Sequence, residues 1–267
     1  MANAVRPIVM IANTANALRL RFMSGSLLFP VRCKRPATIR LAQTRKGKTS
    51  RDMSATNRRL FVAGSTGATG QVLVPLAERL GLSVVPHVRP ARAVAGVKPA
   101  AAVVDLADTP KLIEAMRGST TVVQLIGTMR DRFAKGDTYE TSDIGTTAQL
   151  IAAAKPAGVD HIVLLTSAGA GRPIGAYLKA KAKAEALVRE SGIPWTIFRP
   201  SALEGGERKP IPGFKGVTRL LGLKRFEPIS LEDLAAAMVQ SAVDCAPLGG
   251  VLEGAALWEL VATAQRA

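Results

Sequence analysis

Gly64-Ser65-Thr66-Gly67-Ala68-Thr69-Gly70 is the stretch of this chain that decides its fold. The apolar run Leu60-Phe61-Val62-Ala63 precedes it, and residues with helical periodicity follow from Gln71. This order predicts a strand, a tight turn and a helix. In that setting a glycine turn binds a dinucleotide pyrophosphate, because glycine lets the ligand approach the main chain and the N–H groups at the helix start face it. We therefore predict that all seven residues bind a dinucleotide, with a tight surface turn as the alternative.

The segment after this helix, residues 83–89, predicts a second strand and completes a β-α-β unit. Its end lies 19 residues after Gly70, where such a unit recognises a ribose of the dinucleotide. A site specific for NAD would carry an acidic residue there, but this chain has Arg89 and Arg92. Guanidinium groups pair with a 2′-phosphate, whereas a carboxylate repels it. The sequence therefore favours NADP(H) over NAD(H), with two solvated arginines as the alternative interpretation.

The formal charge of +16 is concentrated near the N-terminus of the 267-residue chain. Residues 1–51 contain 11 Lys or Arg and no acidic residue, which leaves +6 for residues 53–267. We predict a basic leader over residues 1–52 and one nucleotide-binding domain over 53–267. Three interpretations of the leader remain open: an extension before a start at Met53, an organelle transit peptide, or a nucleic-acid-binding arm, although the leader lacks interleaved aromatic residues for base stacking.

Cysteine and histidine are too few, and too badly spaced, for a metal centre. The chain has two cysteines, Cys33 and Cys245, and two histidines, His87 and His161. Neither pair has the spacing of a zinc site or of a disulfide framework. We predict no metal and a reducing compartment: the cytoplasm, or the mitochondrial or plastid matrix if the leader is a transit peptide.

Strand and helix patterns alternate from Leu60 onward, which predicts a Rossmann-type doubly wound parallel sheet, an α/β fold. Hydrophobic residues make up 48% and aromatic residues 4%, so the core is aliphatic, as suits buried parallel strands. Residues 201–228 form a basic, Gly- and Pro-containing insertion on the substrate side. Strands are predicted at 60–63, 83–89, 101–106, 121–127, 161–166, 195–199 and near 251, and helices at 71–77, 108–116, 143–157, 177–190 and 230–243, with a last helix after the strand near 251.

Ligands of such sheets bind at the carboxyl ends of the strands. The glycine turn, Arg89, Asp105, Gly127 and Ser167 should therefore meet in space. Asp105 is a candidate acceptor for the adenine amino group, or alternatively only a turn cap. The predicted cofactor-binding set is completed by Leu106 and Pro200.

A second group of residues predicts chemistry as well as binding. Tyr177 and Lys181 are four residues apart on a predicted helix, which puts them on one face, and Ser167 ends the preceding strand. A carbonyl reductase must protonate the oxygen as hydride reaches the carbon, and a nearby ammonium group helps a phenol to do so. Ser167 would bind the substrate oxygen. The alternative is a surface tyrosine beside a solvated lysine.

These motifs give a family resemblance. Residues from about 58 to 265 resemble the atypical short-chain dehydrogenase/reductase family, in its NmrA-like group of NAD(P)H-binding proteins, near the TIP30/CC3-like oxidoreductases. The matching segments are residues 64–70, 164–167, 177–181 with Glu185, 195–200, 228–235 and 251–254. The resemblance implies that Ser167, Tyr177 and Lys181 stand at the catalytic positions. The family contains both reductases and redox-sensing regulators that have lost turnover.

Two functions therefore compete. The first is an NADPH-dependent oxidoreductase that reduces a small carbonyl or quinone-like substrate by hydride transfer. The second is a non-catalytic NAD(P)H-binding regulator or assembly factor that acts through a protein partner. We expect a small-molecule ligand, no nucleic-acid partner for the core, and a monomer or homodimer. We expect no membrane span, because the most apolar leader segment, Ile8 to Leu18, is short and contains Asn13 and Asn16.

Overall fold

The computed structural model describes residues 58–93, 100–127, 138–205 and 227–266. In these residues seven strands form one sheet in the order β3-β2-β1-β4-β5-β6-β9, and every neighbouring pair is parallel. The predicted Rossmann-type α/β fold is confirmed. The predicted leader, residues 1–52, and most of the predicted insertion lie outside the described residues. No helix within the described ranges is long and apolar enough to cross a bilayer.

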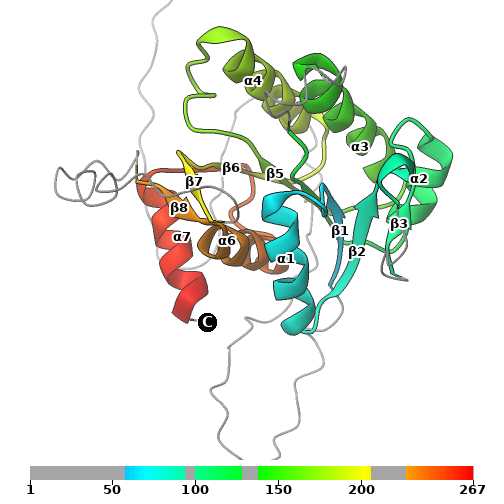
Figure 1. Ribbon diagram of the computed structural model, residues 1–267, viewed down its shortest axis with the longest axis horizontal. Coiled ribbons are helices and arrows are strands. Elements are labelled where there is room, and N and C mark those ends of the chain that lie inside the picture. The colour runs from blue at the N-terminus through cyan, green and yellow to red at the C-terminus, as the bar shows by residue number, and fades with distance from the viewer. Residues whose placement is uncertain (1–57, 94–99, 128–137, 206–226, 267) are drawn as a thin grey trace, which may run out of the picture. The chain divides into compact units, whose positions relative to one another are not determined.

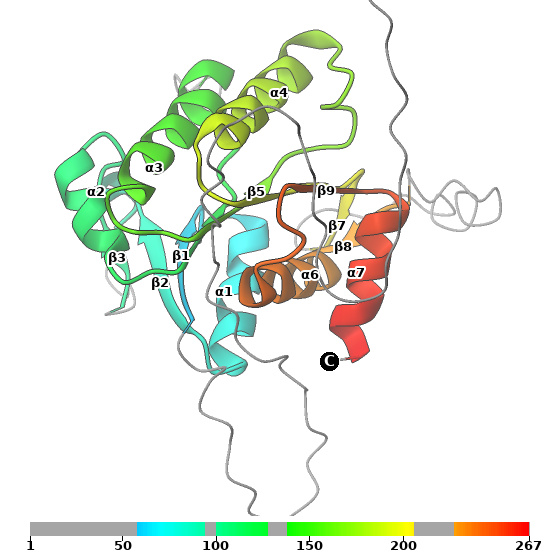
Figure 2. The same ribbon diagram turned by 180° about the vertical axis from the view of Figure 1, so that it is seen from behind.

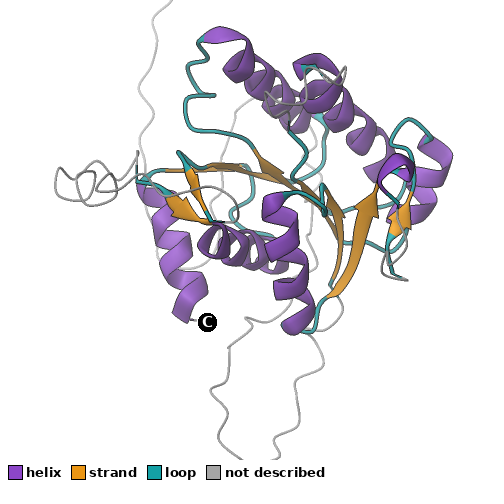
Figure 3. Ribbon diagram, in the orientation of Figure 1, coloured by secondary structure: helices purple, strands orange, loops and turns teal. Residues whose placement is uncertain are grey.

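The elements follow one another as alternating strands and helices (Figure 3). The strands are β1 (Arg59–Ala63), β2 (Ser83–Val88), β3 (Ala102–Val103), β4 (Thr121–Gln124), β5 (His161–Leu165), β6 (Trp195–Arg199), β7 (Leu203–Glu204), β8 (Ile229–Ser230) and β9 (Gly250–Glu253). The helices are α1 (Ala68–Arg79), η1 (Pro90–Arg92), α2 (Thr109–Met116), η3 (Glu140–Gly145), α3 (Thr146–Ala154), α4 (Gly175–Glu190), α6 (Leu231–Asp244) and α7 (Ala255–Arg266).

Helices cover both faces of the sheet. Figures 1 and 2 show α1, α6 and α7 on one face and α2, α3 and α4 on the other. Alternate residues of β1 divide between these layers, as the two-residue period of a strand requires. Leu60 and Val62 pack in the cluster that includes α1 and α6, whereas Phe61 and Ala63 pack in the cluster that includes α2 and α3.

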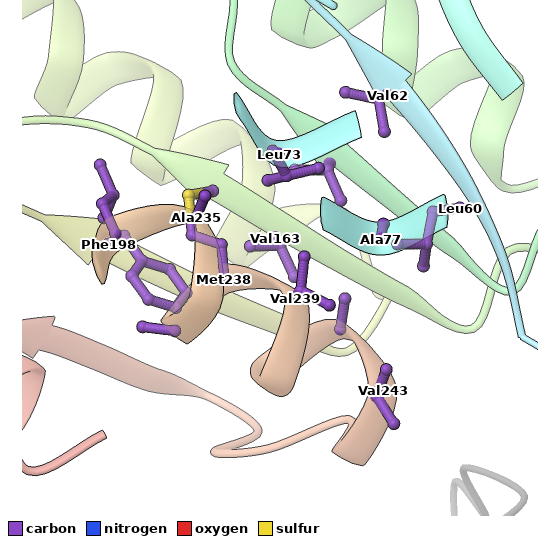
Figure 4. Close-up of a cluster of buried hydrophobic side chains, with 14 of the residues drawn as sticks. Leu60, Val62, Leu73, Ala77, Val163, Phe198, Ala235, Met238, Val239 and Val243 are labelled. Atoms are coloured by element: carbon purple, nitrogen blue, oxygen red, sulfur yellow. The ribbon is translucent and has the colours of Figure 1, made fainter. Parts of the chain in front are cut away.

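The core beside α1 and α6 is a cluster of buried hydrophobic side chains (Figure 4). Leu73 of α1, Met238 of α6 and Phe198 of β6 are all fully buried there. Burying a side chain of this size contributes about 1.5–3 kcal/mol. The layer therefore fixes α1, and with it the glycine turn, against the sheet.

The topology places a ligand site beside β1. The chain adds β2 and β3 on one side of β1, then returns to place β4, β5 and β6 on the other side. A crevice opens at the carboxyl ends of the strands where the order reverses in this way. The turn after β1 and the loop after β4 flank that point.

Some predicted elements differ from the structure. The predicted strand 101–106 is only two residues long, and the predicted strand 121–127 ends at Gln124. Beyond β4 the Ile126 N–H donates to the Gln124 side chain at 3.1 Å. This N–H is therefore bonded to a side chain and not to a neighbouring strand. The predicted helix 143–157 begins earlier, as the π-helix η3, and continues as α3 to Ala154.

A strand pair joins the two described ends of the predicted insertion 201–228, and a side-chain cap begins the helix that follows it. The strands β7 and β8 pair in parallel, which brings Leu203 beside Ile229. Ser230 then begins α6, because its Oγ accepts from the Asp233 N–H at 3.0 Å. This N-cap confirms the helix start that the sequence predicts.

Candidate cofactor and active site

The glycine turn is shaped by close backbone approaches. Gly64 has a φ of +90°, a conformation that favours glycine, and its carbonyl accepts from the Gly67 N–H at 3.0 Å. A Cβ on Gly70 would lie 2.3 Å from the Gly64 oxygen and 2.6 Å from the Ser65 Cα. Glycine is therefore required at position 70, because the first turn of α1 rests directly on the loop.

One cavity of about 620 Å³ runs from this turn across the carboxyl ends of the strands. It brings together most of the residues that the sequence predicts for cofactor and catalysis. The predicted residues on its wall are Gly64, Thr66, Gly67, Ala68, Thr69, Gly70, Arg89, Arg92, Asp105, Leu106, Gly127, Tyr177 and Lys181. The turn, both arginines and the Tyr-Lys pair thus share a single space, large enough for a ligand of drug size.

Three residues of the predicted site lie outside the cavity lining. The Ser65 side chain is buried and donates to the His87 carbonyl at 2.7 Å. Pro200 is buried, and its carbonyl accepts from the Ala168 N–H at 2.9 Å. The Ser167 hydroxyl is half-buried and lies 3.4 Å from the Ala168 carbonyl oxygen. Ser65 and Pro200 join neighbouring segments at these positions, while Thr166 takes a place on the cavity wall.

At one end of the cavity, Arg89 and Arg92 are both exposed and are tied by a turn. The Arg92 N–H donates to the Arg89 carbonyl at 2.8 Å. Asp105 caps its own turn, since its Oδ1 accepts from the Ala107 N–H at 3.0 Å, and it also lines the cavity. This end therefore presents two cations and one carboxylate to a ligand.

His87 also lines the cavity, and the sequence did not assign it to the site. Its Nε2 lies 2.8 Å from the Val104 carbonyl oxygen, and its ring centroid is 5.8 Å from that of Phe61. Burial lowers the pKa of His87, and the charge of Arg89 acts in the same direction. The available signal was a histidine near the end of β2, two residues before Arg89, the predicted ribose-binding residue.

At the other end, Lys181 forms a buried ion pair with a residue that the sequence had placed only at a helix start. The Lys181 Nζ lies 2.7 Å from Asp143 Oδ1, and the two side chains are 8% and 1% exposed. A Cβ on Gly127 would lie 2.6 Å from the same Nζ, so only glycine leaves room for it. The ammonium group extends from α4 and is thereby held between η3 and the loop after β4.

Side-chain hydrogen bonds hold the start of α3, where it continues from the π-helix η3, to β4. The Gln124 Nε2 donates to the hydroxyls of Thr146 and Thr147 at 3.2 and 3.3 Å. The Thr146 hydroxyl donates to the Ser142 carbonyl, and the Thr147 hydroxyl donates to the Asp143 carbonyl at 2.6 Å. Departures from α-helical pairing of this kind recur at functional sites. Here the π-helix brings Thr141 and Ser142 to the cavity wall, and the start of α3 brings Thr146.

A second ion-pair network fixes α4 to the sheet. Glu185 is 2% exposed and accepts from the Arg199 Nε at 2.8 Å and from the Thr166 hydroxyl at 2.8 Å. The Arg199 Nη2 is paired with the other Glu185 oxygen at 2.5 Å. These hydrogen bonds to Glu185 raise the pKa of Arg199. The network sets the position of α4, which carries Tyr177 and Lys181.

The donor set fits a dinucleotide. The wall at residues 66–70 combines main-chain groups at the start of α1 with glycines whose missing side chains leave space, as a pyrophosphate requires. The fold, the turn and this cavity define a nucleotide-binding protein of the Rossmann class.

More narrowly, the chain belongs to the NAD(P)H-binding family, whose sequence pattern matches residues 64–244. This match confirms the resemblance to NAD(P)H-binding proteins drawn from the motifs. Protein FMP52, mitochondrial, from Debaryomyces hansenii is 33% identical over 154 residues, which cover 56% of this chain and 68% of that protein. Protein TIC 62, chloroplastic, from Pisum sativum is 28% identical over 203 residues, which cover 65% of this chain but only 37% of that protein.

Solved structures agree on the fold. A short-chain dehydrogenase/reductase superfamily protein from Agrobacterium tumefaciens with bound NAD aligns with a TM-score of 0.57 over 77% of this chain and 81% of its own. The two sequences are 18% identical, so the likeness concerns the fold. The family match supports a nicotinamide cofactor for this fold.

Proposed function

We propose that this protein is an NADPH-dependent oxidoreductase that reduces a small carbonyl or quinone-like compound by hydride transfer. The observation that carries the proposal is the shared cavity, which joins the glycine turn, the arginine pair and the Tyr177-Lys181 pair. A nicotinamide cofactor with its pyrophosphate at the turn would extend toward both ends of that cavity.

The preference for NADPH over NADH rests on Arg89 and Arg92. Both side chains line the cavity, and both follow β2, where a 2′-phosphate would lie. Their two positive charges favour a phosphate dianion over a free hydroxyl. Asp105 would then accept from the adenine amino group.

The chain's own residues supply the proton and the orientation. Bound NADPH supplies the hydride. Tyr177 donates a proton to the substrate oxygen from the cavity wall, and Lys181 lies 5.7 Å from the centre of the Tyr177 ring. The buried Asp143 carboxylate keeps the Lys181 ammonium in place beside Gly127. Ser167 is the proposed ligand of the substrate oxygen, which requires its side chain to turn toward the cavity.

Replacing Tyr177 by Phe tests the proposal. We expect the Tyr177→Phe variant to bind NADPH with wild-type affinity and to lose NADPH oxidation with a panel of aldehydes, ketones and quinones. Lys179→Met is the matched control for Lys181→Met, because Lys179 is an exposed lysine on the same helix. We expect full activity for the Lys179 variant and a loss for the Lys181 variant. Equal rates in Tyr177→Phe and wild type would refute the assignment.

The alternative function, an NAD(P)H-binding regulator or assembly factor, is favoured by one observation: the Ser167 hydroxyl lies outside the cavity lining. That protein would bind a partner in a manner that depends on NADPH and would turn over no substrate. Partner capture with and without NADPH, run beside the substrate panel, separates the two functions.

We also propose an organelle as the site of action. The two relatives are described as mitochondrial and chloroplastic, and the basic, acid-free composition of residues 1–52 is typical of transit peptides. Residues 53–267 would then be the working domain, as a monomer or homodimer. Fusing residues 1–52 to a fluorescent protein tests this. Import supports the organelle, and diffuse cytoplasmic signal contradicts it.

A further inference from the structure

The side chains that reach α4 from the start of η3 form two pairs with matching spacing. The rings of Tyr139 and Tyr177 have their centroids 5.8 Å apart, tilted by 58°. One helical turn along, Asp143 pairs with Lys181 at 2.7 Å. Tyr139 and Asp143 are four residues apart, as are Tyr177 and Lys181. The two segments therefore contact each other through an aromatic pair followed by an ion pair.

Tyr139 itself sits on a fixed stretch of backbone. Thr138 and Thr141 bond each other reciprocally: the Thr138 N–H donates to the Thr141 hydroxyl at 3.0 Å, and the Thr141 N–H donates to the Thr138 hydroxyl at 3.1 Å. This is the arrangement of a capping box. Further along, the hydrogen bonds from Gln124 to Thr146 and Thr147 anchor α3, which continues directly from η3, to β4.

Tyr177, by contrast, lies in an open position. It is 36% exposed and follows Gly175, which has a φ of +76°, and the 84% exposed Ile174. Its ring contacts the Tyr139 ring and lies 5.7 Å from the Lys181 ammonium group. An exposed tyrosine at a helix start has several accessible rotamers, and a packed aromatic neighbour selects one of them.

We propose that Tyr139 is a positioning residue, whose ring holds the Tyr177 ring at the cavity wall in the orientation needed for proton donation. The expected effect on kcat rests on the proposed function. The expected effect on the orientation of the Tyr177 ring depends only on the contact between the two rings. Because the ring makes the contact, the Tyr139 hydroxyl is dispensable for this role, and phenylalanine should replace it.

The test uses the full-length protein with Tyr139 replaced by Phe, Leu or Met, NADPH as donor and menadione as the quinone probe. We expect kcat to fall about tenfold in the Leu and Met variants, because a proton donor out of position slows the chemical step. We expect less than a twofold change in the Phe variant and an unchanged KM for NADPH in all three. If Tyr139 only stabilised the fold, we would not expect kcat to recover in the Phe variant while the KM for NADPH stays unchanged in all three variants.

A second readout needs no turnover. The chain has two tyrosines, so protein labelled with ¹³C-tyrosine gives two ring spin systems, and each Tyr139 variant leaves only that of Tyr177. We expect the Tyr177 ring shifts to keep their wild-type values in the Phe variant and to move toward free-tyrosine values in the Leu and Met variants. Unmoved shifts in both of these variants, or a Phe variant as impaired as Leu, would overturn the proposal. If wild type reduces no probe, the proposed function fails and the ring shifts alone decide this inference.

Discussion

The Lys181 ammonium and the Asp143 carboxylate form an ion pair 2.7 Å long with both side chains buried. The pair spans 38 positions of sequence and joins α4 to η3 at the cavity wall. Removing one partner of a buried pair leaves the other charge without compensation, which costs about 3–5 kcal/mol.

We predict that Asp143→Ala and Lys181→Met each lower the free energy of unfolding by about 3 kcal/mol. We choose the lower end of the range because Lys181 lines the cavity and its side chain is 8% exposed. The double variant should lose clearly less than the sum of the two, since no single buried charge remains. Urea unfolding followed by circular dichroism measures all four proteins. Additive losses would show that the two groups do not stabilise each other.

The glycine turn allows a matched comparison of two alanine substitutions. In Gly70→Ala the new Cβ would meet backbone atoms at 2.3–2.7 Å, whereas in Gly67→Ala the nearest contact is 3.3 Å. We predict that Gly70→Ala abolishes cofactor binding and destabilises the protein. Overpacking of this kind costs about 1–3 kcal/mol or more. Gly67→Ala should fold with near wild-type stability and bind NADPH less tightly. The thermal midpoint and a fluorescence titration give both quantities, and equal midpoints would contradict the packing argument.

Arg89 and Arg92 should discriminate between the two nicotinamide cofactors. Charge-assisted hydrogen bonds of the kind proposed here are worth about 1.5–3 kcal/mol, or roughly ten- to 150-fold in affinity. We predict that Arg89→Ala weakens NADPH binding by such a factor and changes NADH binding by less than threefold. Arg92→Ala should act in the same direction. Calorimetric titration with each cofactor provides the measurement, and equal weakening of both would remove the phosphate assignment.

His161 should make stability dependent on pH. Its Nε2 lies 2.9 Å from the Thr196 hydroxyl, and burial, together with the charge of Arg58, lowers the pKa of His161 to about 4. Because the unfolded chain binds this proton more readily than the folded protein, stability falls as the pH drops from about 6.5 toward 4. The total loss from this group is on the order of 3 kcal/mol, complete below pH 4.

The measurement is the free energy of unfolding of wild type and of His161→Asn across that pH range. We predict a shallower fall in the variant, although His87, whose pKa is also lowered, and the acidic residues keep some pH dependence in both proteins. Parallel curves would mean that His161 does not titrate as described.

The parts of this molecule that the sequence predicts correctly are governed by local patterns. The strand-turn-helix around Gly64 follows from apolar periodicity and glycine, and the cap at Ser230 follows from its side chain. The parallel sheet follows from the alternation of strands and helices, which leaves few other topologies.

The features that the sequence does not predict depend on contacts between segments that are far apart in the chain. The junction of η3 and α3 is one such feature: Gln124 of β4 bonds Thr146 and Thr147 at the start of α3, and no periodicity in the sequence predicts these contacts. The Asp143-Lys181 pair had one signal, an acidic residue at the start of an Ala-rich helix, but its partner lies on another helix. At Ser167 the direction of a side chain leaving a strand depends on the backbone of the following turn, which composition does not reveal.

Hydride transfer that depends on the Tyr177 hydroxyl is the reaction to be measured. NADPH carrying deuterium at its transferable position is mixed with wild type and with Tyr177→Phe in the presence of aldehyde and ketone probes, because the carbonyl carbon keeps the transferred deuterium in a C–D bond that does not exchange with water. The product is analysed by mass spectrometry. We predict deuterium in the wild-type product, and none with Tyr177→Phe although that variant still binds NADPH. Tight NADPH binding by wild type without deuterium transfer to any probe would contradict the account and favour the regulator.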